Sequence, residues 1–364
     1  MLLIYYRRGR LARDGRLISM SFMITGKTDL LLLNSLSVDA VEGAVEMDRL
    51  AAAGIPFIFI VDAWAEHWVV LDLPSAVSAG IRWNIEGRGT LEDAHLPEGD
   101  FRFNSSVVSR EVYRRGFDIV HNAQFNGDSW LANLTFPTVL DTDLSLEQLA
   151  GCARAPFRLL AEDHLAVFSP ERFISISRGG KISSFPMKGT IDATLPDAAQ
   201  RMLADEKEAA EHVTIVDLIR NDLGMVARQI SVPRYRFITE VKAKGRHLLQ
   251  LSSQVSGELG AEWQNHAGTT LRRLLPAGSV TGAPKKRTAE VIKEAEGYNR
   301  GWYTGVFGVF NGSSLDSGVM IRFVEKSDDG SGTLVYKSGG GITIYSDMES
   351  EYAELKAKIY APAG

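Results

Sequence analysis

The stretch LAVFSPERFISISRGGKISSF, residues 165–185, decides the fold. Three short apolar runs follow one another within it, at 165–169, 173–177 and 181–185. The Arg178-Gly179-Gly180 triplet between the last two runs is typical of a hairpin turn, which predicts that these runs pair as antiparallel strands. Runs of antiparallel strands that alternate with groups of helices are typical of an α+β fold rather than of a doubly wound parallel sheet.

Similar patterns extend in both directions from this stretch. Further strands are expected at 55–61, 131–134, 235–242, 249–259, 302–310, 319–325 and 333–337. Helices are expected at 38–54, 110–126, 197–224, 264–274 and 283–297, and Asp197 is expected to cap the third of these. We therefore expect antiparallel sheets layered with helices.

The chain is expected to form one large domain. Its 364 residues, 45% of them hydrophobic, suffice for a large core. Its Gly and Pro residues are scattered between the predicted elements rather than gathered at one boundary. We assign residues 21–364 to this domain, with a reduced N-terminal part at 21–95 and a core at 96–364. Residues 1–20 are interpreted as an extension or a disordered tail.

The composition argues against several classes of function. A net charge of −5, with 23% charged residues of both signs, argues against a nucleic-acid partner. The longest apolar runs, at 30–33 and 55–61, are far shorter than the roughly 20 residues of a membrane span. Cys152 is the only cysteine, which excludes an intramolecular disulfide and favours the reducing cytoplasm. These observations suit a cytoplasmic protein that acts on a small molecule.

Lys188 stands in an otherwise apolar, turn-forming stretch, FPMKGT at 185–190. Phe185-Pro186 ends the preceding strand and Gly189 lets the backbone turn, so Lys188 is expected at the end of a strand. Desolvation there would lower the pKa of its amine and prepare the amine for nucleophilic attack. The alternative interpretation is an ordinary solvated lysine on the surface.

Two segments carry pairs of glutamates with helical spacing. Glu208 and Glu211 share one face of the helix predicted at 197–224, and Glu351 and Glu354 share one face of another. Either pair alone is typical of a solvated helix face. Four converging carboxylates would repel one another unless a hard divalent cation lay among them, and Mg²⁺ is the natural candidate.

A glycine-rich segment precedes the second glutamate pair. Residues 338–341, SGGG, follow the strand predicted at 333–337 and are expected to form a loop whose N–H groups bind an anion. The alternative is a plain flexible turn. The next helix is expected to begin near Asp347, because Ser346 and Glu349 have the spacing of a capping box.

The segment AGSVTGAPKKR, residues 277–287, resembles a phosphate loop at first sight. It lacks the required Gly-Lys-Ser/Thr sequence, and Pro284 removes a backbone donor. It still opens a predicted helix, whose N-terminal dipole favours an anion.

Together these motifs resemble component I of aminodeoxychorismate synthase, within the chorismate-utilising enzymes that include the anthranilate, isochorismate and salicylate synthases. The resemblance covers roughly the last three quarters of the chain. The matching motifs are SPERF at 169–173, PMKGT at 186–190, AEH at 210–212, IVDLIRNDLG at 215–224, GSVTGAPK at 278–285, IR at 321–322, GGG at 339–341, SD at 346–347 and EYAE at 351–354.

The resemblance implies the family's sandwich of antiparallel sheets and helices, as in anthranilate synthase component I, and a Mg²⁺ ion held by the four glutamates. It implies that Glu171 lies near the reacting ring and that His247 lies near the substrate. A surface or cap glutamate and a core histidine are the alternatives. The implied substrate-binding residues are Thr281, Gly282, Arg322, Gly339, Gly340, Gly341 and Lys358.

Lys188 decides between subfamilies, because anthranilate synthases carry alanine where aminodeoxychorismate synthases carry lysine. The resemblance therefore implies that the chain converts chorismate and ammonia to 4-amino-4-deoxychorismate, for p-aminobenzoate and folate synthesis. Lys188 would add to C2 of chorismate as the C4 hydroxyl leaves. Ammonia would then attack C4 and expel the lysine.

The ammonia is expected to come from a separate glutamine amidotransferase subunit. Cys152 lacks the sequence context of the nucleophile in a glutamine-hydrolysing domain. The alternatives are an anthranilate synthase component I and a non-catalytic chorismate-binding relative.

The chain departs from the family pattern at two positions. Leu131 stands where many relatives have glutamine and where isochorismate and salicylate synthases have lysine, which argues against those two activities. Val309 replaces a common tyrosine, which removes one substrate hydrogen bond. No tryptophan-pocket motif is recognised, so feedback regulation is not expected.

Overall fold

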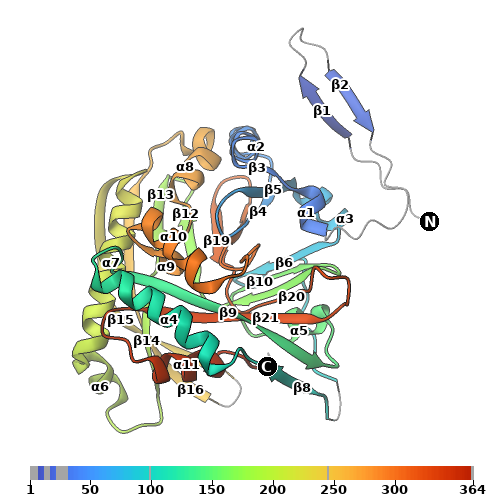
Figure 1. Cartoon of the computed structure of the whole chain (residues 1–364). Helices are drawn as coiled ribbons and strands as arrows, with labels where there is room; N and C mark the ends of the chain where they lie inside the picture. The colour runs from blue at the N-terminus through green and yellow to red at the C-terminus, as the bar shows by residue number, and fades with distance from the viewer. Residues whose placement is uncertain (1–6, 12–16, 22–31, 98–99, 244–245, 362–364) are drawn as a thin grey trace.

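Two antiparallel sheets pack face to face in the computed structural model, and helices cover their outer faces (Figure 1). The structure describes residues 7–11, 17–21, 32–97, 100–243 and 246–361. All strand pairs among these residues are antiparallel. The predicted α+β fold of antiparallel sheets layered with helices is confirmed.

The strands form one nine-stranded sheet, one ten-stranded sheet and a separate hairpin. The nine-stranded sheet has the order β17 (Gly282–Ala283), β9 (Leu131–Thr142), β21 (Leu334–Ile342), β20 (Phe323–Lys326), β11 (Leu165–Ser169), β10 (Phe157–Ala161), β6 (Ile81–Ile85) and β7 (Arg88–Gly89), with β8 (Phe103–Ser106) paired to β9. The ten-stranded sheet has the order β14 (Met187–Asp192), β16 (Arg246–Glu258), β13 (Lys181–Ser184), β12 (Arg172–Ile176), β19 (Leu315–Val319), β18 (Val306–Phe310), β4 (Phe57–Val61), β5 (His67–Asp72) and β3 (Val38–Asp39), with β15 (Arg228–Ala243) paired to β16. The hairpin consists of β1 (Arg7–Leu11) and β2 (Leu17–Ser21), and the rest of the tail predicted at 1–20 lies outside the described residues.

The helices lie between and around these strands. They are α1 (Leu32–Leu36), α2 (Ala40–Ala52), α3 (Leu73–Ser78), α4 (Arg110–Phe125), α5 (Leu146–Cys152), α6 (Ala198–Ala204), α7 (Glu206–Gly224), α8 (Ala267–Leu274), α9 (Gly278–Thr281), α10 (Lys285–Glu296) and α11 (Met348–Ala357), with a short 3₁₀ turn at Trp263–His266. Among the described residues, no helix combines the length and the apolar composition that a membrane span needs.

Strand β4 explains why the molecule is layered. Its five residues are all fully buried, because successive side chains point to opposite faces of the sheet and both faces are covered. Phe57, Phe59 and Val61 pack in the cluster that includes α2, α7 and α8. Ile58 and Ile60 pack against strands of the other sheet. The continuous apolar run at 55–61 therefore places this strand at the centre of the fold.

The helix predicted over 197–224 is two helices. Asp197 stands at the N-cap position of α6, as predicted, but it has φ +52° and makes no side-chain capping hydrogen bond. Asp205 separates α6 from α7, and its side chain accepts a hydrogen bond from the backbone N–H of Glu208. This break sets the start of α7, and Glu208 and Glu211 therefore lie in its first two turns.

Two predictions about the C-terminal strands are wrong. The expected strand at 319–325 is interrupted, because β19 ends at Val319 in one sheet and β20 begins at Phe323 in the other. Arg322, with φ +55°, lies in this crossing. The glycines expected in a loop at 338–341 belong to β21 and pair with β9. A Cβ atom on Gly339 would lie 2.2 Å from the carbonyl oxygen of Leu134, so this close strand approach requires glycine.

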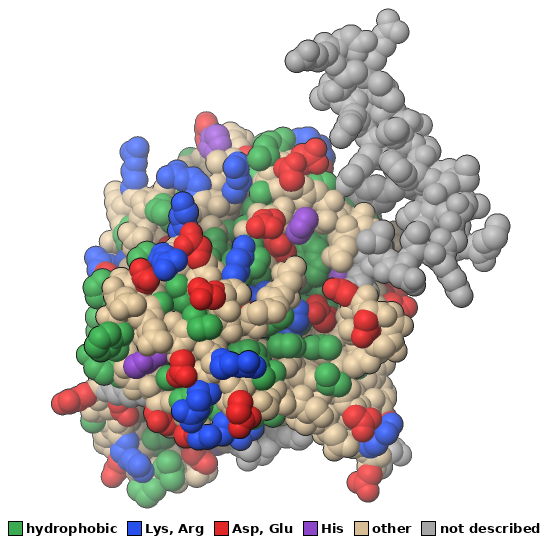
Figure 2. Space-filling model, viewed as in Figure 1, with side chains coloured by type: hydrophobic (Ala, Val, Ile, Leu, Met, Phe, Trp, Pro, Cys, Tyr) green, Lys and Arg blue, Asp and Glu red, His purple; other side chains and the backbone are tan. Residues whose placement is uncertain are grey.

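Acidic and basic side chains are mixed over the face of the molecule that Figure 2 shows. This face therefore does not present a broad field of one sign.

A buried histidine makes stability depend on pH. His164 is 1% exposed, its Nδ1 accepts the backbone N–H of Leu33 at 3.1 Å, and burial lowers its pKa to about 4. As the pH falls below 6.5, His164 binds a proton in the unfolded chain, but in the folded protein it stays neutral down to about pH 4. The free energy of unfolding therefore decreases as the pH falls from 6.5 to about 4. We expect His164 to contribute roughly 2 kcal/mol to the loss of stability between pH 7 and pH 5, measured by urea unfolding. His164→Asn should show a smaller loss, and an equal loss would contradict this assignment.

Candidate functional site

Lys188 lies on β14, the edge strand of the ten-stranded sheet, where the pairing with β16 shifts register between Met187 and Thr190. Its Nζ donates a hydrogen bond to Glu211 Oε2 at 2.8 Å, and the two side chains are 25% and 13% exposed. Burial lowers the pKa of Lys188, but Glu211, followed by Glu208 and Glu354, outweighs it, and the pKa is raised. The prediction of a lowered pKa is wrong, because carboxylates surround the amine.

The first glutamate pair lies beside this lysine. Glu208 and Glu211 lie in the first two turns of α7, and α7 packs against β14. Glu208 Oε2 lies 3.2 Å from the position that a Cβ atom on Gly189 would occupy. Gly189 has φ +85°, so this turn beside the carboxylate favours glycine. Strand β14 thus brings Lys188 against both carboxylates.

The second glutamate pair lies on α11. The predicted start of this helix is confirmed, but its capping box is wrong: Asp347 caps the helix by accepting the N–H of Ser350 at 2.9 Å. Ser346 Oγ instead donates to Glu351 Oε1 at 2.8 Å. Glu354 forms an ion pair with Lys358 at 2.6 Å. Desolvation of Glu354 acts to raise its pKa, but Lys358 outweighs that effect and the pKa is lowered.

The glycines of β21 lie between the two glutamate pairs. A Cβ atom on Gly340 would lie 3.5 Å from Glu351 Oε2, 3.6 Å from Glu354 Oε1 and 3.6 Å from Lys358 Nζ. A Cβ atom on Gly341 would lie 3.6 Å from Lys188 Nζ. These two positions without side chains therefore border both groups of charges.

Lys358 and Leu131 complete the surroundings of the glycine strand. Lys358 Nζ donates to the carbonyl oxygen of Gly339 at 2.7 Å, so this part of the strand presents an acceptor to a cation. The predicted loop of N–H donors is wrong, because these residues are strand residues. A Cβ atom on Gly341 would lie 3.2 Å from Leu131 Cδ1, which places an aliphatic side chain beside Lys188.

Glu171 belongs to the same charged group. Burial raises the pKa of its carboxyl, while a hydrogen bond with Ser279 and the charges of Arg322, Lys358 and Lys188 act in the opposite direction. Ser279 was missed as a site residue, although it lies within the GSVTGAPK motif. The Arg322 guanidinium lies 5.9 Å from the centre of the Tyr360 ring.

Thr281 and Gly282 end the one-turn helix α9 beside this group. Thr281 is 2% exposed. Gly282 has φ +124°, and a Cβ atom on it would lie 1.8 Å from the carbonyl oxygen of Leu131. Only glycine allows β17 to approach β9 this closely. Gly282 therefore brings this part of the backbone next to Leu131.

His247 is the predicted site residue that the structure places elsewhere. Its side chain is 41% exposed, and its Nε2 lies 3.1 Å from Glu240 Oε2 within the β15–β16 hairpin. The hydrogen bond described for the His247 side chain joins it to Glu240 and not to the Lys188 group. In the β14–β16 pairing, Thr190 lies opposite Gln250, which was not among the predicted site residues.

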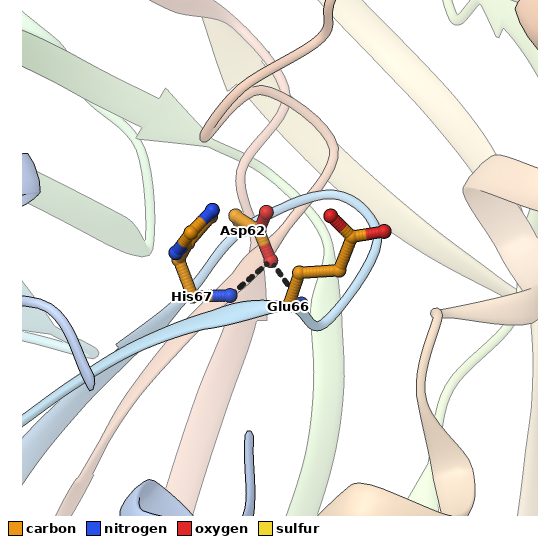
Figure 3. A group of neighbouring side chains, drawn as sticks. All are labelled: Asp62, Glu66 and His67. Atoms are coloured by element: carbon orange, nitrogen blue, oxygen red, sulfur yellow. Dashed lines mark hydrogen bonds between the residues drawn. The ribbon is translucent and has the colours of Figure 1, made fainter. Parts of the chain in front are cut away.

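A second cluster of potential metal ligands lies in the turn between β4 and β5 (Figure 3). Asp62, Glu66 and His67 each offer a ligand atom within 4.8 Å of the others. Asp62 Oδ1 accepts the backbone N–H groups of Glu66 at 2.7 Å and of His67 at 3.0 Å. This cluster is explained as the closure of a tight turn. Among the described residues, no three of the four glutamates predicted as ligands have carboxylate oxygens within 4.8 Å of one another.

Comparisons with known proteins show what this chain is similar to. The family model described as chorismate binding enzyme matches residues 77–364. An uncharacterized PabA-like protein of Pasteurella multocida is 43% identical over 85% of this chain and 94% of its own length. Aminodeoxychorismate synthase component 1 of Escherichia coli is 33% identical over 75% of this chain and 62% of its own length. Anthranilate synthase component 1 of Archaeoglobus fulgidus is 35% identical over 71% of this chain and 64% of its own length.

A solved structure supports the fold. MenF, the menaquinone-specific isochorismate synthase of Escherichia coli, superposes with a TM-score of 0.69 over 88% of this chain and 82% of its own. The two sequences are 15% identical in this comparison, so it bears on the fold alone.

Proposed function

The chain belongs to the chorismate-binding enzyme family, and from that premise we propose that it converts chorismate and ammonia to 4-amino-4-deoxychorismate. The observation that carries the proposal is Lys188, a lysine held among carboxylates and bordered by glycines that leave space next to its amine. A lysine with this access is suited to form a covalent bond with a bound substrate.

The proposed reaction uses three side chains in sequence. Lys188 first gives up a proton to solvent, while the 2.8 Å hydrogen bond from its Nζ to Glu211 Oε2 holds the amine in place. The neutral Nζ then bonds to C2 of chorismate while the C4–O bond breaks. Burial favours the protonated form of Glu171, which is therefore suited to donate a proton to the C4 hydroxyl as it leaves as water. Ammonia next bonds to C4, and the bond between Lys188 and C2 breaks.

Mg²⁺ is proposed as the cofactor, held by carboxylates of Glu208, Glu211, Glu351 and Glu354. All four offer oxygen donors, which Mg²⁺ prefers. They form an open set, since no three have carboxylate oxygens within 4.8 Å of one another among the described residues. An open set would leave coordination positions for a carboxylate of the substrate. When bound, the ion would supply a fixed positive charge for the ring carboxylate.

Ammonia is proposed to come from a separate glutamine amidotransferase subunit. The only thiol of the chain, Cys152, is 3% exposed, and burial raises its pKa. A buried thiol with a raised pKa is a poor nucleophile for glutamine hydrolysis. The chain therefore lacks a cysteine suited to release ammonia by itself.

The glycine strand offers a test of where the substrate lies. Gly341→Ala would place a methyl group 3.6 Å from Lys188 Nζ without a backbone clash, so we expect KM for chorismate to rise about tenfold with little change in Tm. Gly339→Ala is the matched variant, and it should lower Tm strongly because of its 2.2 Å approach to Leu134. Wild-type KM in Gly341→Ala would place the substrate elsewhere.

Product analysis separates the proposal from its main alternative, anthranilate synthesis. Purified chain, chorismate, Mg²⁺ and ammonium are incubated, and the products are identified by mass spectrometry with a parallel assay for pyruvate. The proposal predicts 4-amino-4-deoxychorismate and no pyruvate, because the enolpyruvyl group is retained. Anthranilate with equimolar pyruvate would identify an anthranilate synthase. Binding of chorismate without any product would identify a non-catalytic relative.

A further inference from the structure

His212 follows Glu211 on α7 and is fully buried. Consecutive helix residues point about 100° apart, so Glu211 faces Lys188 while His212 faces another element. His212 Nε2 lies 2.7 Å from Ser253 Oγ on β16. The imidazole therefore joins α7 to the strand that pairs with β14.

Ser253 also contacts the chain leading into Lys188. Its backbone N–H donates to the carbonyl oxygen of Pro186 at 3.1 Å, two residues before Lys188. Its Oγ accepts the backbone N–H of Arg236 at 2.9 Å, so Arg236 and His212 together fix the position of the hydroxyl. Ser253 is thus hydrogen-bonded both to His212, the neighbour of Glu211, and to Pro186 in the segment that carries Lys188.

We propose that His212 and Ser253 are positioning residues that set the contact between Lys188 Nζ and Glu211 Oε2. The inference deepens the proposed function, on which its kinetic part rests. Shifting α7 relative to β14 would separate the amine from the carboxylate that holds it in place, and misplacements of this kind slow catalysis without removing a reacting group.

Packing alone does not explain the imidazole. His212 Nδ1 is buried and has no hydrogen-bond partner among the described residues. An orphaned buried nitrogen is unfavourable, and an aliphatic side chain of similar size would avoid it. The bond from Nε2 to Ser253 is therefore the feature that accounts for a histidine here.

The test compares four variants. Ser253→Ala removes the hydroxyl that contacts His212 Nε2. His212→Asn also removes this hydrogen bond, because the asparagine amide reaches only as far as the position of Nδ1. His212→Gln retains a polar group near the position of Nε2. Ser256→Ala is the matched control: Ser256 is 2% exposed on the same strand, and its Oγ lies 2.9 Å from Ser183 Oγ, away from α7.

We expect kcat for chorismate consumption to fall about tenfold in Ser253→Ala and His212→Asn, with KM within about twofold of wild type. His212→Gln should recover most of the loss, and Ser256→Ala should keep wild-type kcat. Wild-type kcat in Ser253→Ala, or an equal loss in Ser256→Ala, would overturn the proposal.

A crystal structure of Ser253→Ala supplies a readout that needs no activity. The proposal predicts that the Lys188 Nζ–Glu211 Oε2 contact, 2.8 Å in the intact chain, is lost in the variant. An unchanged contact would overturn the proposal even if the variant were slow. If the wild-type chain consumed no chorismate, the proposed function would fail, while this distance would still decide the positioning role.

Discussion

Lys188→Ala is expected to reduce formation of 4-amino-4-deoxychorismate by roughly a thousandfold or more, with ammonium as the nitrogen source. The reason is chemical, because Nζ is the atom proposed to bond to C2. The measurement is kcat at saturating chorismate and ammonium, with circular dichroism and Tm as checks on folding. Removing the amine leaves Glu211 without the ion pair seen at 2.8 Å, so Tm should change moderately while the fold is retained.

Turnover near the wild-type rate in Lys188→Ala would contradict the covalent route. Ammonia would then attack chorismate directly, without a covalent intermediate. The same preparation can be analysed for anthranilate, since a change of product with retained turnover would show that Lys188 selects the reaction instead of enabling it.

Removal of Mg²⁺ by EDTA is expected to lower turnover by at least about a hundredfold, and turnover should return when Mg²⁺ is added. Mg²⁺ and chorismate together should raise Tm much more than either does alone, because the substrate carboxylate supplies ligands that the open set of glutamates lacks. Glu211→Gln and Glu354→Gln should each reduce this joint shift.

Glu349→Gln is the matched control for the metal prediction. Glu349 lies on α11 with Glu354, but it is 52% exposed and forms an ion pair with Arg110. The substitution removes the same charge from the same helix and should leave the joint Tm shift intact. Activity that survives EDTA, or a loss of the shift in Glu349→Gln equal to that in Glu354→Gln, would contradict the proposed ligand set.

The layered fold was predictable where the sequence pattern matched the packing. The apolar run at 55–61 predicted a buried strand, and β4 is buried on both faces. The Arg178-Gly179-Gly180 turn predicted the hairpin of β12 and β13, which is confirmed. These elements were accessible because a short stretch of residues determines each of them.

Features that depend on distant segments were not predictable. Gly339, Gly340 and Gly341 resemble a loop in the sequence, yet they are strand residues, because β9 approaches them too closely for side chains. The cap at Asp205 was missed in favour of Asp197, since both positions carry the same residue type. Tertiary contacts decided each case.

The candidate site shows the same division. Spacing alone paired Glu208 with Glu211 and Glu351 with Glu354. The structure places the first pair beside Lys188 and the second pair beside Gly340, and Gly341 lies next to the Lys188 amine. The direction of the pKa shift at Lys188 was not predictable, because it depends on how near the carboxylates lie.

The proposed mechanism depends most on a bond between Lys188 and the substrate, and peptide mass spectrometry measures that bond directly. The chain is incubated with chorismate and Mg²⁺ in the absence of ammonia, quenched and digested. The account predicts a mass increase equal to chorismate less one water on the peptide that contains Lys188, and the loss of this increase when ammonium is added before quenching. An enzyme that turns over with ammonium but never carries this adduct would contradict it.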